Sequence, residues 1–265
     1  MERTKKLSWL EQLKIACLKP REYPRLLQIG KGRVVCFFIV ISFLITFLGY
    51  GMNVIGFSVS VGGTKNFIMN RLPEFELKNG TLEMDGALNF ELGGFHIAAD
   101  TSKDQVDTEE FSNAYGGEVF LAKKEAVIRL NAMQQTQYQI SFTNFKNAVF
   151  NNKAMLGLVP AIHLFIGIMF LVNWIANILL YLLLCWFISL FVYMNQKARN
   201  EEISFGKVFR LSIYARVIFE LLETLGTTAG MGFFSGSLWM IISYLGSYYL
   251  LGMAFVKTED KKKSE

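Results

Sequence analysis

Apolar stretches lie on both sides of one polar segment. The first apolar stretch, Val34 to Ile55, contains 22 residues without a charge. As a helix that rises about 1.5 Å per residue, it is long enough to cross a hydrocarbon core of about 30 Å. Residues 57–154 are polar with short alternating runs, and residues 155–256 are largely apolar again. This pattern predicts an α+β integral membrane protein with a small folded domain between its first two spans.

Charge is distributed unevenly along the chain. Residues 1–33 contain nine Lys or Arg and three acidic residues, whereas residues 57–153 contain nine basic and twelve acidic residues. Because basic residues that flank a span stay on the cytoplasmic side, we expect the N-terminus inside and the domain of residues 57–154 outside the cell. The excess of basic residues before the first span therefore indicates the orientation of the chain in the membrane. It does not predict a nucleic-acid partner, since no aromatic residues interleave a basic patch.

The stretch from Met155 to Met194 is too long for one span. Its 40 nearly uninterrupted apolar residues would form a helix of about 60 Å, twice the thickness of the hydrocarbon core. It holds either two spans or one span with an apolar extension. Four basic residues at 195–210 favour a cytoplasmic location for the next segment, which requires an odd number of crossings. We predict one span, Trp174 to Met194, preceded by an outer helix.

Two further spans complete the predicted bundle. Phe205–Ala229 returns outward, residues 230–236 form a tight turn, and Ser237–Val256 crosses back. The basic tail of residues 257–265 then lies in the cytoplasm. The expected architecture is a four-span helical bundle with both termini inside. Its parts are a basic leader at 1–33, a first span at 34–56, the β-rich domain at 57–154, and an outer helix with spans two to four at 155–256.

The basic leader contains a predicted short helix. Ser8 and Glu11 have the spacing of a capping box, and apolar residues recur at helical spacing as far as Leu18. This helix either lies on the inner leaflet with its lysines toward anionic lipid, or belongs to a solvated leader that only sets the topology.

The segment of residues 57–154 predicts a β-rich domain. Its clearest signal is Asn79-Gly80 between the alternating runs Phe75–Lys78 and Thr81–Met84, which is typical of a type I′ hairpin. Further strands are expected at 88–92, 95–99, 119–121, 126–130 and 137–142, with a short capped helix at 107–115.

Several acidic residues follow the fourth predicted strand: Asp100, Asp104, Asp107, Glu109 and Glu110. They either hold a cation or form a solvated loop. The glycine and ligand spacing of a calcium loop is absent, which favours the solvated loop.

Residue types that carry catalytic or metal chemistry are scarce. The three cysteines, at positions 17, 36 and 185, lie outside the β-rich domain, and the two histidines, His96 and His163, are far apart in sequence. No Cys/His spacing resembles a zinc site, no glycine pair lies in a phosphate-binding pattern, and no nucleophile and base can be placed together. We therefore expect no enzymatic activity, no cofactor and no metal.

One polar stripe interrupts the third predicted span. Five residues at steps of 4, 4, 3 and 4 share one helix face: Ser212, Arg216, Glu220, Glu223 and Thr227. Because ionisable residues within a membrane usually face a protein interior or a water-filled cavity, the stripe is either a polar path that contacts a ligand or a helix-packing seam. Small residues at Gly226 and Gly230, and at Ser243 and Ser247, favour the seam.

Five short motifs are spread over most of the chain: LPEFELKNGTLEMDG (72–86), HIAADTS (96–102), VFLAKKEAVIRLN (119–131), YQISFTNF (138–145) and FGKVFRLSIYA (205–215). Together they resemble a bacterial membrane-protein family, a domain of unknown function, that includes MalA-type maltodextrin-utilisation proteins. The last motif is also similar, more weakly, to Yip1-like membrane families. The resemblance implies an accessory protein of the cytoplasmic membrane, near carbohydrate uptake.

These observations lead to a leading hypothesis and a rival. The leading hypothesis is a non-enzymatic, multi-pass protein of a bacterial plasma membrane. It would act as an accessory, sensor or scaffold protein whose outer domain contacts an envelope ligand or a partner such as a permease. The rival is a component of a membrane transporter that uses the polar stripe. An intramembrane enzyme, which would depend on Glu220 and Glu223 alone, is the third alternative.

Overall fold

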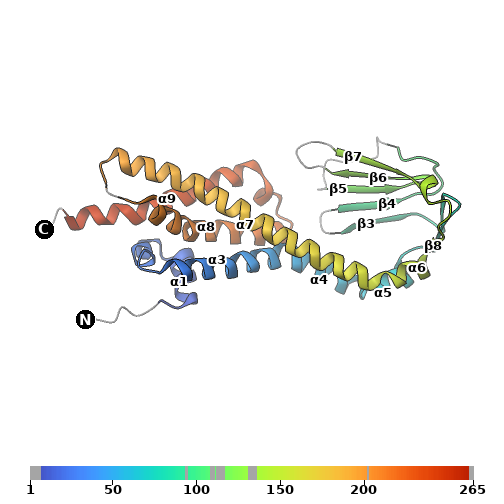
Figure 1. Cartoon of the computed structure of the whole chain (residues 1–265), viewed down its shortest axis with the longest axis horizontal. Coiled ribbons are helices and arrows are strands. Elements are labelled where there is room, and N and C mark those ends of the chain that lie inside the picture. Colours follow the sequence, from blue (N-terminus) through green and yellow to red (C-terminus); the bar gives the residue numbers. More distant parts are fainter. Residues whose placement is uncertain are drawn as a thin grey trace. The chain divides into compact units, whose positions relative to one another are not determined.

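The structure is a computed structural model that describes residues 7–92, 95–107, 111, 117–130, 136–201 and 203–262. The chain combines helices with two β-sheets and divides into two compact units. The helical unit consists of Met1–Gly51 and Phe170–Glu265, and the sheet unit consists of Met52–Met169. Figure 1 labels most of the helices and strands of both units.

The helical unit contains short N-terminal helices and four long ones. Its elements are α1 (Trp9–Leu18), η1 (Pro20–Glu22), α2 (Tyr23–Leu26), α3 (Lys31–Thr46), the π-helical segment η2 (Phe47–Gly51), most of α7 (Val159–Ala198), α8 (Phe205–Thr228), η6 (Gly232–Ser235) and α9 (Ser237–Lys262).

Three stretches of helix are long and apolar enough to cross a membrane: Lys31–Val61, Val159–Ala198 and Ser237–Phe255. α8 contains the predicted third span but is not among them. Its central turns carry Arg216, Glu220 and Glu223, and charges at this density lower its mean hydropathy. The described chain thus has the composition of a membrane protein, with one candidate span fewer than the four predicted.

α7 is one unbroken helix of 40 residues. It continues through residue 173, where the predicted outer helix leads into the predicted span, and the short α6 (Asn152–Gly157) precedes it. Because α7 does not reverse direction, the stretch of residues 155–194 holds a single crossing at most.

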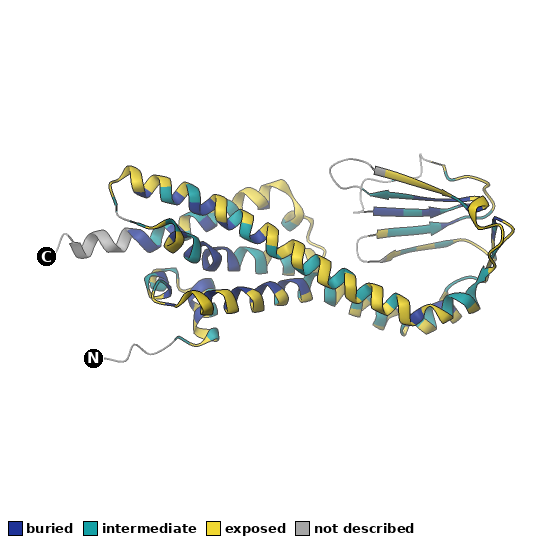
Figure 2. Ribbon diagram, in the orientation of Figure 1, coloured by how far each residue is buried: buried dark blue, intermediate teal, exposed yellow. Residues whose placement is uncertain are grey.

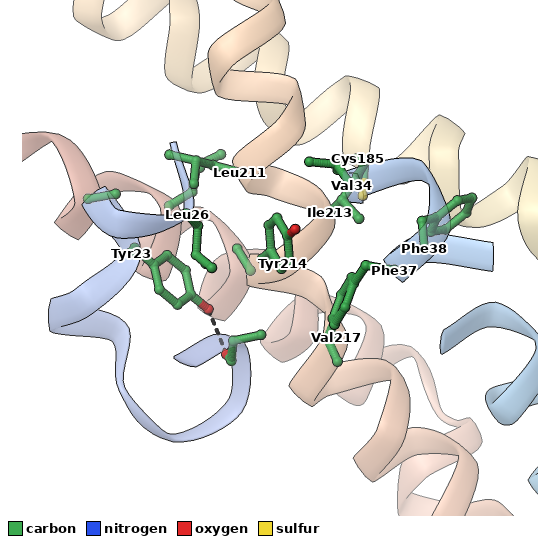
Figure 3. Packing of buried hydrophobic residues seen from close by; sticks show 14 of the residues in the cluster. Tyr23, Leu26, Val34, Phe37, Phe38, Cys185, Leu211, Ile213, Tyr214 and Val217 are labelled. Carbon is green, nitrogen blue, oxygen red and sulfur yellow. Dashed lines mark hydrogen bonds between the residues drawn. The ribbon is translucent and has the colours of Figure 1, made fainter. Parts of the chain in front are cut away.

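The middle of α8 is enclosed by protein on every face. Seven consecutive residues, Leu211 to Val217, are buried, which is almost two turns of helix and therefore includes every direction around its axis. The neighbouring helices α1, α3 and α9 all contact α8, and α7 is joined to it by the Tyr181 hydroxyl, which donates to the Ile213 carbonyl over 2.7 Å. Figure 2 colours these buried residues dark blue, and Figure 3 shows the apolar side chains packed around Tyr214.

The predicted leader helix is present as α1, and its capping box is formed in both directions between Ser8 and Glu11. One face of α1, which carries Gln12, Ile15 and Ala16, is buried against protein. Tyr214 of α8 donates to Gln12 Oε1 over 2.8 Å, and Tyr23 of α2 donates to the Ala16 carbonyl over 2.7 Å (Figure 3). Burial raises the pKa of the nearby Cys17 thiol to about 11. The leader is therefore part of the helical core, which neither sequence interpretation anticipated.

The sheet unit contains two sheets. Its elements are α4 (Met52–Val61), α5 (Thr64–Asn66), the π-helical segment η3 (Phe67–Arg71), β1 (Phe75–Lys78), β2 (Thr81–Met84), β3 (Leu88–Leu92), β4 (Phe95–Ala99), β5 (Gly117–Leu121), β6 (Glu125–Leu130), β7 (Thr136–Ser141), η5 (Phe142–Phe145), β8 (Phe150–Asn151), α6 and the start of α7. One sheet has the order β2-β1-β8, and the other has the order β3-β4-β5-β6-β7.

The predicted hairpin is confirmed in its register and its turn. Phe75 faces Met84 and Leu77 faces Leu82 across β1 and β2, and Leu82 is buried against both apolar residues of β1. Asn79 and Gly80 have φ of 54° and 78°, as a type I′ turn requires. The other predicted strands correspond to β3, β4, β5, β6 and β7. The helix predicted at 107–115 falls largely outside the described residues.

Replacement of Gly80 by Val should destabilise the sheet unit. A β-branched residue is strained at this φ, and a Cβ at Gly80 would lie 3.1 Å from both the Phe142 carbonyl oxygen and Thr143 Cα. We expect a loss of at least about 1 kcal/mol, measured by thermal unfolding of the purified chain. Gly157→Ala is the control, because a Cβ at Gly157 meets no atom within 4 Å. Equal unfolding temperatures for the two variants would contradict the assigned turn.

Candidate functional site

The polar stripe of α8 becomes more exposed along its length. Ser212 and Arg216 are buried, Glu220 and Glu223 are half-buried, and Thr227 is exposed. The five residues share one helix, as predicted, but they contact different neighbours. They do not converge on one point.

Each member of the stripe contacts a group within the helical unit. Ser212 Oγ lies 2.9 Å from Ser189 Oγ and 3.2 Å from the Cys185 carbonyl oxygen. Glu223 Oε2 accepts a hydrogen bond from the Trp239 indole over 3.1 Å. The Thr227 hydroxyl donates to the Glu223 carbonyl over 2.7 Å.

Arg216 and Glu220, four residues apart on α8, form an ion pair in which the arginine is buried and the glutamate is half-buried. Arg216 Nη2 lies 2.6 Å from Glu220 Oε1, and the arginine side chain is only 5% exposed. Its Nε has no hydrogen-bond partner among the described residues. Both partners of this ion pair belong to α8, so the pair does not join α8 to another helix.

The small residues near the stripe permit close packing. A Cβ at Gly226 would overlap the ring of Phe234, and a Cβ at Gly246 would overlap the ring of Phe219. Ser243 and Ser247 are buried on α9, where the Ser247 hydroxyl donates to the Ser243 carbonyl. Of these contacts, the one between Gly246 and Phe219 joins α9 to α8, as close packing of two helices requires.

The sheet unit contains a second polar cluster, which sequence reasoning missed. His96, Glu118 and Arg129 face one another directly across β4, β5 and β6. Glu118 is completely buried. Its two carboxylate oxygens lie 3.7 Å from His96 Nδ1 and 3.3 Å from Arg129 Nη2. We call these three residues the sheet triad.

Aromatic rings and an amide enclose the sheet triad. The Arg129 guanidinium lies 4.8 Å above the centre of the Phe111 ring, and the rings of Phe111 and Phe120 are 4.6 Å apart. The His96 ring meets Phe120 edge to face, and its Nε2 lies 2.9 Å from Asn89 Oδ1. A continuous set of contacts therefore runs from Asn89 through the triad to Phe120.

A cavity of ≈ 250 Å³ adjoins His96. Its floor is the sheet face that carries Ala98 and Phe120, and its wall is the loop of residues 100–107. Eight of the lining residues are apolar, and the six polar ones are Asn89, His96, Asp100, Lys103, Gln105 and Asp107. The cavity thus combines an apolar surface with a few hydrogen-bonding groups, the usual composition of a small-molecule site.

The loop of residues 100–107 is fixed to the hairpin formed by β5 and β6. The amides of Lys123 and Lys124 donate to the carbonyls of Lys103 and Asp104, and the buried Glu125 accepts from the Val106 amide over 2.9 Å. The cavity wall is therefore held by hydrogen bonds.

The acidic residues of this loop have local partners. Asp100 accepts from the amide and the hydroxyl of Ser102, and these bonds lower the pKa of its carboxyl. The Lys124 ammonium likewise lowers the pKa of Asp104. Within the described residues, no three His, Cys, Asp or Glu side chains are grouped to hold a metal ion. Glu109 and Glu110 lie outside the described residues.

Comparison with known proteins places this chain in one family but assigns no activity. The model of a family described as a protein of unknown function (DUF1189) matches residues 10–252. The comparisons with curated proteins and with solved structures found no match. The match includes both the helical unit and the sheet unit, so the two belong to a single family.

The ion pair in α8 should behave as a buried pair. Loss of one partner strands a charge in a low dielectric, which costs about 3–5 kcal/mol. Arg216→Leu and Glu220→Leu should each lower the unfolding temperature in detergent, and the double Leu variant should recover much of the loss. Lys207→Leu, at an exposed site of the same helix, should change little. Single variants as stable as wild type would show that the pair contributes nothing to stability.

Arg129 should stabilise the sheet unit through Glu118. Arg129→Met leaves the completely buried carboxylate without its cation, and we expect a loss of about 3 kcal/mol in thermal unfolding. Arg129→Lys retains the charge and should lose less. Lys146→Met, at an exposed position of the same unit, is the neutral control. If Arg129→Met matched this control, the contact between Arg129 and Glu118 would contribute nothing to stability.

Proposed function

We propose that this chain, which belongs to the DUF1189 family, is a non-enzymatic multi-pass membrane protein with an accessory or sensor role. Its sheet unit would bind a small envelope ligand or a segment of a partner protein. Its helical unit would hold the sheet unit at the outer surface of a bacterial plasma membrane and transmit binding to a membrane partner such as a permease.

The proposed topology has four spans, with α8 as the third. α8 follows α7 and precedes α9, each of which is long and apolar enough to cross a membrane. A helix that is enclosed by other helices does not need an apolar surface, since its polar groups meet protein rather than lipid. With four spans, both termini lie on the same side of the membrane. The basic residues of the leader and the tail favour the cytoplasmic side for both.

The cavity beside His96 is the observation that carries the proposed binding role. It has a volume of ≈ 250 Å³, slightly less than the range typical of drug-sized ligands. This volume favours a small molecule or a single side chain. Because the loop of residues 100–107 is held by backbone hydrogen bonds, the site is preformed and binding would cost little ordering entropy. A link to carbohydrate uptake depends on the resemblance of the sequence motifs alone.

The contacts of the polar stripe support an accessory role over a transporter. Arg216 and Glu220 neutralise one another, and Glu223 accepts from Trp239. A transport path needs polar groups that face a common water-filled space, whereas these groups face different neighbours. The same arrangement gives no support to an intramembrane enzyme based on Glu220 and Glu223.

A large side chain placed in the cavity should abolish binding by the sheet unit without affecting membrane anchoring by the helical unit. Ala98 lines the cavity, so Ala98→Phe should exclude a ligand or an inserted side chain while the helices stay intact. We expect a membrane protein to copurify with the wild-type chain from its own membranes in mild detergent, and to be lost from Ala98→Phe. Ala148→Phe, at an exposed site outside the cavity, should retain that protein.

Two outcomes would contradict the proposal. One is autonomous solute flux when the purified chain alone is placed in liposomes, which would favour the transporter. The other is reversed topology. In a cysteine-free background, an impermeant maleimide should label Thr101→Cys but not Ser204→Cys in intact cells, and labelling of the second variant alone would place the sheet unit inside.

A further inference from the structure

β7 forms an open edge of the five-stranded sheet. It pairs with β6 on one side, and no described strand pairs with its other side. Within the part of the chain that the structure describes, no backbone group hydrogen-bonds to residues 137–141 from that side. An unpaired edge presents a row of amide and carbonyl groups to which another strand can add.

The usual devices that protect an edge strand are missing from β7. Residues 137–141, QYQIS, contain no charge, no proline and no glycine, although charged residues and prolines commonly block edge pairing. The opposite edge strand, β3, contains Glu91 and contacts α4. On β7, Tyr138 is 54% exposed and Ile140 is 37% exposed. These side chains belong to the same face of the sheet, because they pair with Ile128 and Ala126 at alternate positions of β6.

The order of residues in β7 is self-complementary when two copies run antiparallel. With Gln139 opposite Gln139 of the second copy, Tyr138 faces Ile140, and Gln137 faces Ser141. Every polar residue then meets a polar residue, and every apolar residue meets an apolar one. A shift by one position would place Tyr138 opposite Gln139 or Ser141, because side chains alternate between the two faces of a strand.

We propose that two copies of this chain associate through β7, antiparallel about Gln139, and so join their five-stranded sheets into one continuous sheet. The twofold axis passes through Gln139, so the same patch is used on both copies, as in most homodimers. Backbone hydrogen bonds would supply the attraction, and the contact between Tyr138 and Ile140 would occur twice and fix the register.

Cysteine cross-linking in membranes tests the register directly. In a cysteine-free background, oxidation should link Gln139→Cys to its counterpart and give a covalent dimer. Gln137→Cys alone should not link, because its counterpart lies four residues away along the strand. Coexpressed Gln137→Cys and Ser141→Cys chains should link to each other. This second pair keeps the test valid if Gln139→Cys disturbs the bond that Gln139 donates to Glu125.

A charge on the edge should separate the two copies. Ile140→Lys should convert a dimer into a monomer, measured as the mass of the detergent-solubilised full-length chain. Phe145→Lys places the same charge at another exposed apolar residue, outside β7, and should leave the dimer intact. A monomeric wild type, a dimer that survives Ile140→Lys, or cross-linking of Gln137→Cys alone as strong as that of the coexpressed pair would each overturn the proposal.

Discussion

The burial of the middle of α8 is the constraint on which the helical unit depends. Seven consecutive buried residues require neighbours in every direction. α3 and α9 supply part of that enclosure, and α1 supplies another part. Two tyrosine hydroxyls fix the arrangement: Tyr181 bonds to the backbone of α8, and Tyr214 reaches out from α8 to Gln12. A buried hydroxyl without a hydrogen-bond partner destabilises the fold by more than a satisfied one stabilises it. These two bonds therefore favour the placement of the helices in which both hydroxyls have partners.

Enclosure also explains why α8 differs in composition from its neighbours. Where a helix contacts protein, polar side chains that find hydrogen-bond partners stabilise it. Where a helix contacts lipid, each polar side chain is destabilising. Ser212 and Arg216 are buried at the level where α8 is enclosed, and Thr227 is exposed near the end of the helix, where its hydroxyl is satisfied by the preceding turn. Hydropathy alone therefore finds three candidate spans and omits α8, whose buried middle contains polar residues.

Local sequence signals were sufficient for the elements but not for their partners. The positive φ values at Asn79 and Gly80 follow from residue type alone, and the capping box at Ser8 is a property of four adjacent residues. The parallel pairing of β4 with β5 depends on a long connection, and so does the division into two sheets. Neither the strand pairing nor the sheet division can be inferred from the alternation of apolar and polar residues. That alternation shows which side chains share a face of a strand, but not which strands lie next to each other.

The two polar clusters show the same limit on site prediction. The α8 stripe was predicted because its members recur at helical spacing, but the sequence could not distinguish a path from a seam. The sheet triad was missed because Glu118 and Arg129 are eleven residues apart, and His96 reaches them only through the parallel register. Three polar residues on one face of three neighbouring strands would have been recognisable only if the strand order had been known.

The sheet triad and the cavity are physically linked through His96. Its ring lines the cavity and lies on the same sheet face as the completely buried Glu118. A buried charge pair adds little net stability compared with apolar residues of similar volume, so stability alone is a weak reason for this cluster. A ligand that contacts His96 would change the surroundings of Glu118 through one intervening ring, and Glu118 in turn faces Arg129 and the Phe111 ring beneath it. The contacts of His96, Glu118 and Arg129 thus join the cavity to three adjacent strands of the sheet, of which β6 also pairs with β7.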